Sequence, residues 1–293
     1  MKVKKSNAEK VFGVFNVVLM CICMVACLYP LLYVLFASFS VPSQIVHHSG
    51  LLLRPLGFTT RAYELVLSNK NILTGYLNTI FIVVVGTAIN IVLTALLAYV
   101  LSRKNLLWGP VIMGLVMFTM FFDGGIIPRF LLVKELKLLD TLFALIIPTA
   151  INTMNLIILR TFFRSLPESL EESARIDGAN DFVILFRIVL PLSSAAIAVI
   201  LLYYAVSHWN AWFNASIYIR KRELFPLQVI LREILITNSN EAMTLDSSIA
   251  DIAELEVILR YAAIVVSTLP ILVLYPFLQK YFVKGVMIGA VKG

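Results

Sequence analysis

The sequence contains few charged residues. Only 14% of the 293 residues are charged, whereas 60% are hydrophobic. Soluble domains carry about 25% charged and about 45–50% apolar residues, so an ordinary soluble enzyme is disfavoured. Intrinsic disorder, which needs low hydrophobicity, is excluded. Although the net charge is +7, the basic residues are scattered through short hydrophilic gaps, so we expect no nucleic-acid partner.

Histidine and cysteine, the usual metal ligands, occur only three times each. Cys21, Cys23 and Cys27 lie in one apolar run and match no common zinc spacing, so we interpret them as small apolar packing residues. His47 and His48 have no carboxylates near them in sequence, which favours solvated loop residues over a metal site. Common motifs of zinc proteases, serine hydrolases and P-loop ATPases are absent too. We therefore predict no catalytic residue and no metal site.

Long uncharged runs are what the sequence has in abundance. A helix that crosses a bilayer needs about 20 mostly apolar residues, and lipid offers no partner to unpaired backbone groups, so such runs become helices. The runs cover residues 11–40, 72–102, 106–122, 141–159, 189–219 and 261–279. We predict an all-α polytopic membrane protein with six transmembrane helices. Residues 1–10 would form a cytoplasmic N-terminus, and 11–293 a single transmembrane domain.

The distribution of charge indicates the orientation. With the N-terminus in the cytoplasm, the segments on that side are 1–10, 103–105, 160–188 and 280–293. Their excess of basic over acidic residues equals the whole net charge of +7, whereas the outer segments are close to neutral. Because Lys and Arg concentrate in cytoplasmic loops, we predict that both termini lie in the cytoplasm, N-in and C-in.

The interiors of the predicted spans contain no Asp, Glu, Lys or Arg, and His208 is their one histidine. Ion-coupled carriers usually place ionisable groups at mid-membrane, so a carrier of that type is disfavoured, and we interpret His208 as a hydrogen-bonding packing residue. Amides and aromatic rings remain, and they suit a path for a polar solute such as a sugar. Interhelical hydrogen bonds and an interfacial aromatic belt explain them equally well. The candidate substrate-path residues are Asn152, Asn155, Tyr203, Trp209, Asn210, Trp212 and Asn214.

The polar segment 160–191 lies between the fourth and fifth predicted spans and carries the marks of folded structure. Ser165 and Glu168 have the spacing of a capping box, and Pro167 suits the first turn of a helix. Gly178 suits a left-handed helix stop. We therefore expect a short helix between Ser165 and Gly178.

A second short helix is expected after that stop. Asp181 can cap it, and Pro191 breaks the chain before the next span. A helix that merely covers the membrane surface is the alternative, but such helices favour Lys and Arg, whereas this segment is net acidic. We therefore interpret the pair of helices as a docking element for a groove in a partner protein.

These residues resemble the EAA loop of ABC importer permeases. The family pattern is Glu-Ala-Ala, three residues, Gly, about nine residues and Ile/Leu-Pro. The matching positions are Glu172, Ser173 in place of the first alanine, Ala174, Asp177, Gly178 and Pro191. The extended form Arg-Ile-Asp-Gly-Ala is typical of the carbohydrate-uptake branch, and the layout resembles its smaller, maltose-type subunit. The resemblance covers roughly residues 70–293 and implies a type I ABC importer permease fold with 160–191 as the cytoplasmic coupling loop.

Two further stretches resemble permeases associated with complex oligosaccharides of the pectin, alginate or aldouronate type. They are Asp123-Gly-Gly-Ile-Ile-Pro with Leu-Leu-Asp140-Thr, and the tail from Gln279 to Gly293. The outer segments are nearly neutral overall, so an acidic sugar does not follow from the residues themselves.

The resemblance also implies partners and a location. A homologous second permease would complete the pore, and two copies of an ABC ATPase would hold ATP and Mg²⁺ and receive the EAA loops. An extracytoplasmic sugar-binding protein would deliver an oligosaccharide to the outer loop 218–257. Glu172 would pair with a basic group of the ATPase, and Gly178 would allow the tight turn. This non-catalytic chain would bind no cofactor and would be a multi-pass protein of the bacterial plasma (inner) membrane.

Two other functions are weighed against the importer. An integral membrane enzyme acting on lipid-linked sugar would need a carboxylate or histidine cluster at one membrane face. The acidic group Asp246, Asp251, Glu254 and Glu256 has the spacing of an acidic helix rather than of a site. A passive channel would have no use for the acidic, glycine-hinged cytoplasmic loop.

Overall fold

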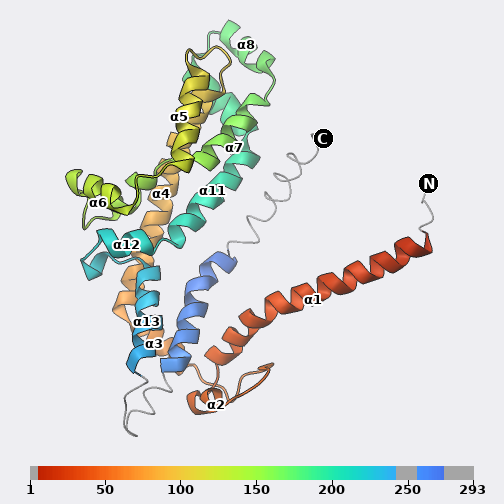
Figure 1. Ribbon diagram of the computed structural model, residues 1–293, viewed down its shortest axis with the longest axis vertical. Coiled ribbons are helices and arrows are strands. Elements are labelled where there is room, and N and C mark those ends of the chain that lie inside the picture. Colours follow the sequence, from red (N-terminus) through yellow and green to blue (C-terminus); the bar gives the residue numbers. More distant parts are fainter. Residues whose placement is uncertain (1–5, 242–255, 274–293) are drawn as a thin grey trace. The chain divides into compact units, whose positions relative to one another are not determined.

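The computed structural model describes residues 6–241 and 256–273, and the elements within these ranges are helices (Figure 1). They fall into two units, residues 1–69 with 233–269, and residues 70–232 with 270–293. The all-helical prediction is therefore confirmed for the described residues. Four predictions lie wholly or partly outside those residues: the tail motif, 1–5 of the predicted cytoplasmic N-terminus, the end of the sixth predicted span, and 242–255 of the outer loop with all of its acidic group but Glu256.

Helix α1 spans Asn7–Ser38 and is the longest helix of the first unit. It starts after Ser6, whose backbone N–H donates to the Glu9 carboxylate at 2.8 Å. The apolar stretch of α1 is long enough to cross a membrane and is exposed along its length. The three cysteines on it are exposed free thiols in this chain, and their interpretation as small apolar packing residues stays a prediction.

Two short helices follow α1 in the first unit, α2 at Pro42–Val46 and α3 at Arg61–Ser68. The Ser38 and Tyr63 hydroxyls lie 2.6 Å apart, and the rings of Phe39 and Tyr63 stack with their centroids 4.8 Å apart. These contacts tie the end of α1 to α3.

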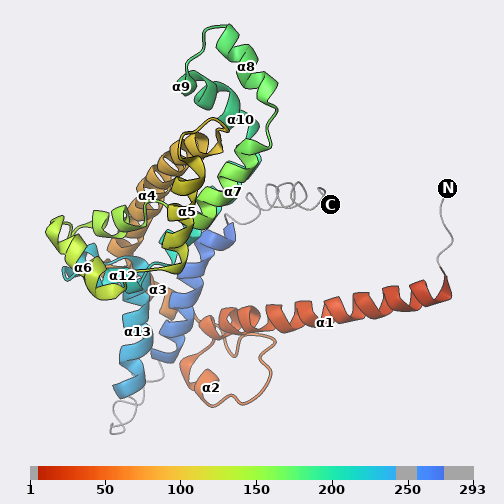
Figure 2. The ribbon, with the colours of Figure 1, turned by 45° about the horizontal axis from the view of Figure 1, so that its top comes forward.

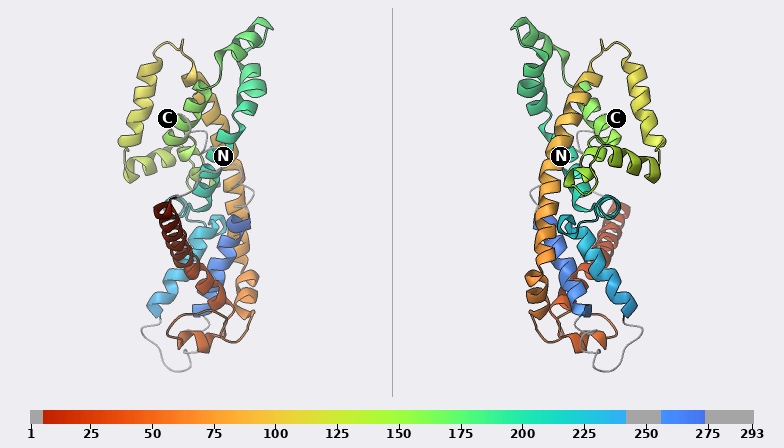
Figure 3. Two further views of the ribbon diagram at one scale, coloured as in Figure 1. Left: turned by 90° about the vertical axis from the view of Figure 1, so that its right-hand side faces the viewer. Right: turned by 90° about the vertical axis from the view of Figure 1, so that its left-hand side faces the viewer.

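The second unit holds the other labelled helices and the start of α13 (Figure 2, Figure 3). In chain order they are α4 (Lys70–Ser102), α5 (Gly109–Phe121), α6 (Ile126–Glu135), η1 (Leu142–Leu145), η2 (Ile147–Thr149), α7 (Thr153–Arg164), α8 (Glu168–Ile176), α9 (Asp181–Ile184), η3 (Leu185–Val189), α10 (Leu190–Leu192), α11 (Ser194–Trp209), α12 (Phe213–Tyr218), η4 (Arg222–Leu224) and α13 (Leu227–Glu241). Here η3 is one turn of π-helix, and the other η elements are 3₁₀ turns.

Helix α4 forms the axis of the second unit, with α7 and α11 packed along it (Figure 2). Small residues allow this close approach. A Cβ at Gly86 would lie 2.7 Å from Nε2 of His208, so glycine is what lets α11 come so near. The His208 ring is buried, and its Nε2 lies 2.7 Å from Oδ1 of Asn90. The interpretation of His208 as a hydrogen-bonding packing residue is confirmed.

Within residues 6–241 and 256–273, three helices are long and apolar enough to cross a membrane on their own: α1, α4 and the helix Glu256–Val273. Three further pairs qualify only together, and each pair is bent. The bend is 113° between α5 and α6 and 50° between η1–η2 and α7. The third bend, of 85°, lies between the stretch Asp181–Leu192, which ends with α10, and α11. Six crossings with both termini in the cytoplasm therefore remain a prediction.

The predicted spans 141–159 and 189–219 are not continuous helices in the structure. The first is interrupted between η2 and α7, and the second at Ser193 and again between α11 and α12. Pro148 and Pro191 lie within the short helices just before the first and second of these breaks. Proline removes a backbone donor and clashes with the preceding turn, which disfavours a continuous helix through these positions.

Side chains from α4 and α11 form hydrogen bonds with the backbone groups that are left unpaired at the break between η2 and α7. Asn90 Nδ2 donates to the backbone carbonyls of Thr149 at 2.8 Å and Ala150 at 2.7 Å. The Tyr204 hydroxyl accepts from the Asn152 backbone N–H at 2.9 Å. Because hydrocarbon cannot pair with such groups, a broken helix at membrane depth needs protein partners of this kind.

The aspartates of the two oligosaccharide-type stretches both form turns. Asp123 Oδ1 accepts from the Gly125 N–H at 3.1 Å, and its other oxygen pairs with Arg129 at 2.6 Å. Asp140 Oδ1 accepts from the Arg220 backbone N–H at 2.5 Å and so joins α6 and η1 to the end of α12. These backbone N–H groups hold the pKa of both carboxyls below the usual 3.8, so each stays ionised at physiological pH.

Candidate functional site

The predicted docking segment forms two short helices, but the start of the first differs from the prediction. Helix α8 begins at Glu168 after Pro167, and no side chain caps it. Ser165 instead ends α7, where its hydroxyl donates to the Phe162 carbonyl at 2.7 Å. The predicted capping box between Ser165 and Glu168 is therefore wrong, because the preceding helix already uses the serine.

The end of α8 follows the prediction. Gly178 has φ +81°, the left-handed conformation that glycine adopts without steric cost. The Ala179 N–H donates to the Ala174 carbonyl at 2.9 Å, and the Gly178 N–H donates to the Arg175 carbonyl at 3.0 Å. This pair of bonds is a Schellman motif, which satisfies the last carbonyls of a helix and turns the chain away.

The second helix also starts one residue earlier than predicted. Asn180, not Asp181, caps α9, because its side chain accepts from the Val183 N–H at 2.9 Å. Pro191 lies in α10, near the end of the helical stretch Asp181–Leu192, and the chain bends at Ser193. The break before the next helix thus follows Pro191 directly, within one turn.

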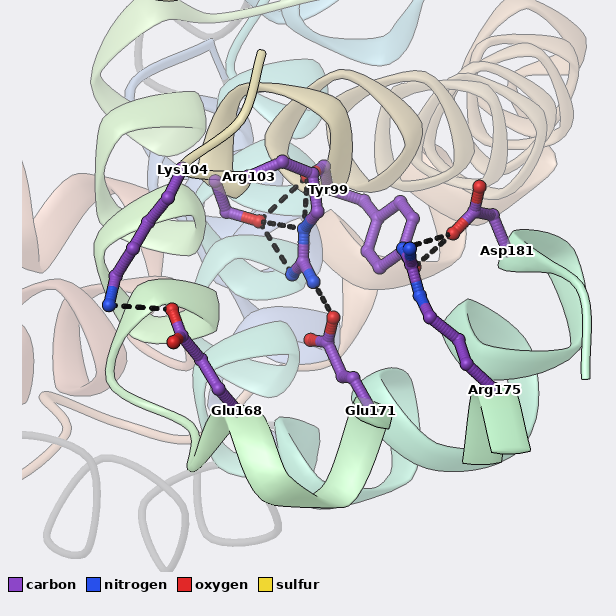
Figure 4. A network of polar contacts seen from close by, with 8 residues as sticks. Tyr99, Arg103, Lys104, Glu168, Glu171, Arg175 and Asp181 are labelled. Atoms are coloured by element: carbon purple, nitrogen blue, oxygen red, sulfur yellow. Dashed lines mark hydrogen bonds and ion pairs between the residues drawn. The ribbon is translucent and has the colours of Figure 1, made fainter. Parts of the chain in front are cut away.

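A network of charged side chains joins α8 to the end of α4 (Figure 4). Arg103, just past α4, forms an ion pair with Glu171, and its guanidinium carbon lies 4.3 Å from the centroid of the Tyr99 ring. The Arg103 side chain also donates to the Ser102 hydroxyl at 2.8 Å and to the Tyr99 carbonyl at 3.2 Å. Burial lowers the pKa of the Arg103 guanidinium, which nonetheless stays charged. The end of α4 therefore holds α8 through Arg103, whose charge is paired and whose side chain is hydrogen-bonded.

Three further contacts complete the network (Figure 4). Arg175 pairs with Asp181 at 2.8 Å, and the Tyr99 hydroxyl donates to the same carboxylate at 3.3 Å. Lys104 pairs with Glu168 at 2.7 Å, but both of these side chains are more than half exposed. Asp181, predicted as a helix cap, thus joins α9 to α8 and α4.

The two sides of α8 differ in what they contact. Glu171 and Ala174, three residues apart and so on one side, lie against the rest of the unit, and Ala174 belongs to its apolar core. The remaining predicted coupling residues are exposed, namely Glu172, Ser173, Asp177 and Gly178. A cleft of about 430 Å³ lies beside α8, lined by the end of α4, the α4–α5 loop, the end of α7 and α8, with Glu172 at its wall.

The predicted substrate-path residues divide into two groups. Asn152, Asn155 and Tyr203 line one cavity of about 470 Å³, with Arg129 from α6 and Ser207 from α11. The side chain of Asn152 also caps α7 by accepting from the Asn155 N–H at 3.1 Å. A cavity beside broken backbone, with amide and hydroxyl groups on its wall, has the chemistry to hold a polar ligand.

The other predicted path residues do not line that cavity. Trp209 is buried and meets the Tyr76 ring, and Trp212 lies under the Arg232 guanidinium at 3.5 Å. The Asn210 side chain donates to the Val206 carbonyl at 3.0 Å at the end of α11, and Asn214 lies in α12. The positions of Trp209 and Trp212 are therefore explained by ring packing, and that of Asn210 by a hydrogen bond at a helix end.

Sequence reasoning missed the residues that hold these sites together. Arg103 and Lys104 directly follow a predicted span, and opposite charges occur in segment 160–191, so charge pairing was a signal that could have found them. Asn90 carried a weaker signal, a lone amide in an apolar run. No local pattern pointed to Tyr99.

Comparison with known proteins is decisive. No family model matches the chain. The polygalacturonan/rhamnogalacturonan transport system permease protein YtcP of Bacillus subtilis (strain 168) is 46% identical over 267 residues, which cover 91% of this chain and 93% of that protein. The chain belongs to the carbohydrate ABC transporter permeases. Protein LplC of the same organism is 42% identical over 288 residues, 98% of this permease and 97% of LplC.

A solved structure supports the same assignment. This permease matches a chain from the crystal structure of a bacterial ABC transporter involved in the import of the acidic polysaccharide alginate. The TM-score is 0.86 at 35% identity, with 95% of this permease and 99% of that chain covered. The predicted ABC importer permease fold is therefore confirmed, and the permease is a multi-pass membrane protein. Relatives that are transport permeases favour a non-catalytic subunit over an enzyme acting on lipid-linked sugar.

Proposed function

We propose that this permease is one of two homologous membrane subunits of an ATP-driven, binding-protein-dependent oligosaccharide importer, and that α8 docks an ATPase. One observation carries the proposal: α8 is held along one side and is bare along the other. On the bare part Ile176 is 87% exposed and lies next to Asp177, one turn from Glu172. An exposed isoleucine beside acidic groups suits insertion into a basic-rimmed groove of a partner.

In this proposal the two ATPase copies bind ATP and Mg²⁺, and the permease binds neither. Glu172 pairs with a basic group of the ATPase, and the Gly178 turn fixes the angle at which α8 meets it. Closure of the ATPase dimer displaces α8, and the two permeases rock between outward-open and inward-open states. The coupling loop and both termini face the cytoplasm of a bacterium, and the binding protein delivers sugar to the outer loop 218–257.

Changing Glu172→Gln tests the docking. We expect recovery of the ATPase with the tagged permease from native membranes in mild detergent to fall about tenfold, because a charge pair across the interface loses one partner. Glu168→Gln is the matched control, since Glu168 is on the same helix and its pair with Lys104 is exposed to solvent. Recovery of the wild-type permease with no ATPase and no second permease would refute the proposed function.

For the substrate we propose an oligosaccharide that contains uronic acids. Two relatives are named for polygalacturonan with rhamnogalacturonan and for alginate, polysaccharides built from uronic acids. The cavity at the α7 break supports this class, because Arg129 lines it beside amide and hydroxyl groups. Arg129 also pairs with Asp123, but a guanidinium has five N–H donors and can hold a second carboxylate as well. A guanidinium recognises a carboxylate with paired hydrogen bonds.

Changing Arg129→Gln tests this substrate class. We expect uptake of oligogalacturonate into proteoliposomes containing the whole transporter to fall about tenfold, because a hydrogen bond to a charged group is lost. Lys134→Gln, on the same helix but outside this cavity, should leave uptake unchanged. Equal uptake by the two variants would argue against Arg129 as the carboxylate-binding group.

A further inference from the structure

Two ion pairs join the α4–α5 loop to α8, and they differ in burial. The side chains of Arg103 and Glu171 are only 22% and 14% exposed. Those of Lys104 and Glu168 are 66% and 59% exposed. Exposed pairs contribute little because water and salt screen them, whereas removing one partner of a largely buried pair leaves an uncompensated charge. The pair of Arg103 and Glu171 is thus the firm connection between the two elements.

Arg103 is itself fixed to α4 rather than to a flexible loop. Its guanidinium is held by the Ser102 hydroxyl, by the Tyr99 carbonyl and by the face of the Tyr99 ring (Figure 4). A lysine could not make these contacts at once, because only a planar fork donates in several fixed directions. A displacement of α8 therefore acts on the end of α4.

Helix α4 has firm contacts at its other end as well. Asn78 Nδ2 donates to the carbonyls of Glu223 at 2.8 Å and Phe225 at 3.1 Å, and Thr79 accepts from the Leu227 N–H at 2.9 Å. A Cβ at Gly75 would lie 3.1 Å from the Leu227 Cα, so the backbones touch there. Between the two ends α4 is one unbroken helix of 33 residues, about 50 Å long.

We propose that Arg103 is a positioning residue that transmits motion of α8 through the rigid α4 to the segment 222–227 at the opposite end of this unit. This inference rests on the proposed docking of an ATPase to α8. Broken helices absorb displacement at their bends, whereas a continuous helix moves as a body. Of the helices in the described part of the second unit, α4 alone combines an unbroken span with fixed contacts to α8 and to 222–227.

The test follows ATP-dependent movement at the far end, so it needs no sugar. In the complete transporter, Cys21, Cys23 and Cys27 are replaced by serine, since these exposed thiols would react. A single cysteine replaces the exposed Glu223, and its rate of maleimide labelling is compared with and without ATP and vanadate. In the otherwise wild-type protein we expect ATP to change this rate.

With Arg103→Gln we expect the ATPase to be recovered and ATP to be hydrolysed as before, while the ATP-dependent change in labelling falls about tenfold, within the usual range of coupling between sites. Glu171→Gln should do the same, and the double variant should be no worse than either single one. Lys104→Gln is the matched control and should respond as the wild type does.

The outcomes separate the two proposals. Absence of any ATPase from the wild-type preparation would refute the docking itself. An unchanged labelling response in Arg103→Gln, or additive effects of the two glutamine variants, would refute transmission through Arg103 while leaving docking intact. Loss of the ATPase from Arg103→Gln alone would also overturn the inference, because Arg103 would then support docking rather than transmission.

Discussion

Replacing Asn90 with leucine should prevent the permease from accumulating as a stable membrane protein. The leucine removes both donors to the Thr149 and Ala150 carbonyls and the partner of His208 Nε2. Each buried polar group left unpaired costs about 1–3 kcal/mol, so we expect a total loss of roughly 3 kcal/mol or more. The measurement is the melting temperature and yield of the detergent-purified variant, monitored by tryptophan fluorescence and size-exclusion chromatography.

Asn78→Leu provides the matched control for this experiment. Asn78 lies on the same helix and also donates to two backbone carbonyls, but at a more exposed position, where water can replace the amide. Its variant should melt only slightly below the wild type. Equal melting temperatures for the two leucine variants would show that the helix break does not depend on Asn90.

Changing Gly178→Val should abolish transport while the helical bundle stays folded. The glycine has φ +81°, where a residue other than glycine is strained by about 1–2 kcal/mol and a β-branched one by more. An added Cβ would meet no atom within 4 Å, so the strain acts on the backbone turn and not on the core. The Schellman bonds then fail and α8 frays, so under the proposed function the ATPase loses its docking helix.

Gly178→Asn distinguishes backbone strain from any other effect of the substitution. Asparagine adopts the left-handed conformation more readily than other non-glycine residues, so this variant should keep most of the transport activity. Transport of a radiolabelled oligogalacturonate and co-purification of the ATPase are the two readouts, with melting temperature as the check on folding. If valine and asparagine behave alike, the turn conformation is not what the coupling loop requires.

Local signals in the sequence were sufficient for part of this architecture. The end of α8 at Gly178 was predictable because it depends only on the left-handed backbone conformation of one residue, which glycine favours. The long apolar run of α4 was predictable because burial in lipid needs nothing but length and hydropathy. The same reasoning failed at 141–159 and 189–219, since hydropathy averages over a window and does not register a backbone break that distant side chains satisfy.

The network of charged side chains that joins α8 to the end of α4 shows a second limit of sequence reasoning. Arg103 and Glu171 are far apart in the chain, and their pairing exists only because α4 and α7 pack side by side and bring α8 over the α4 end. Trp209 and Trp212 were predicted to line the substrate path because tryptophan suits sugars. Trp209 ends α11, which is apolar on nearly all sides, so its sequence did not indicate which face this ring would occupy, and Trp212 lies beyond α11, just before α12.

The helix break that Asn90 satisfies also constrains how the permease is made. The chain enters the membrane as it is synthesised, from its N-terminus onward. Asn90 precedes Thr149 by 59 residues, so the amide is already in the bilayer when the broken segment arrives. Had the order of these helices been reversed, the bare carbonyls would have waited in hydrocarbon for a partner not yet translated. The carbonyls of the break thus have their partner ahead of them in the chain, whereas the Asn152 N–H is paired only when Tyr204 arrives, 52 residues later.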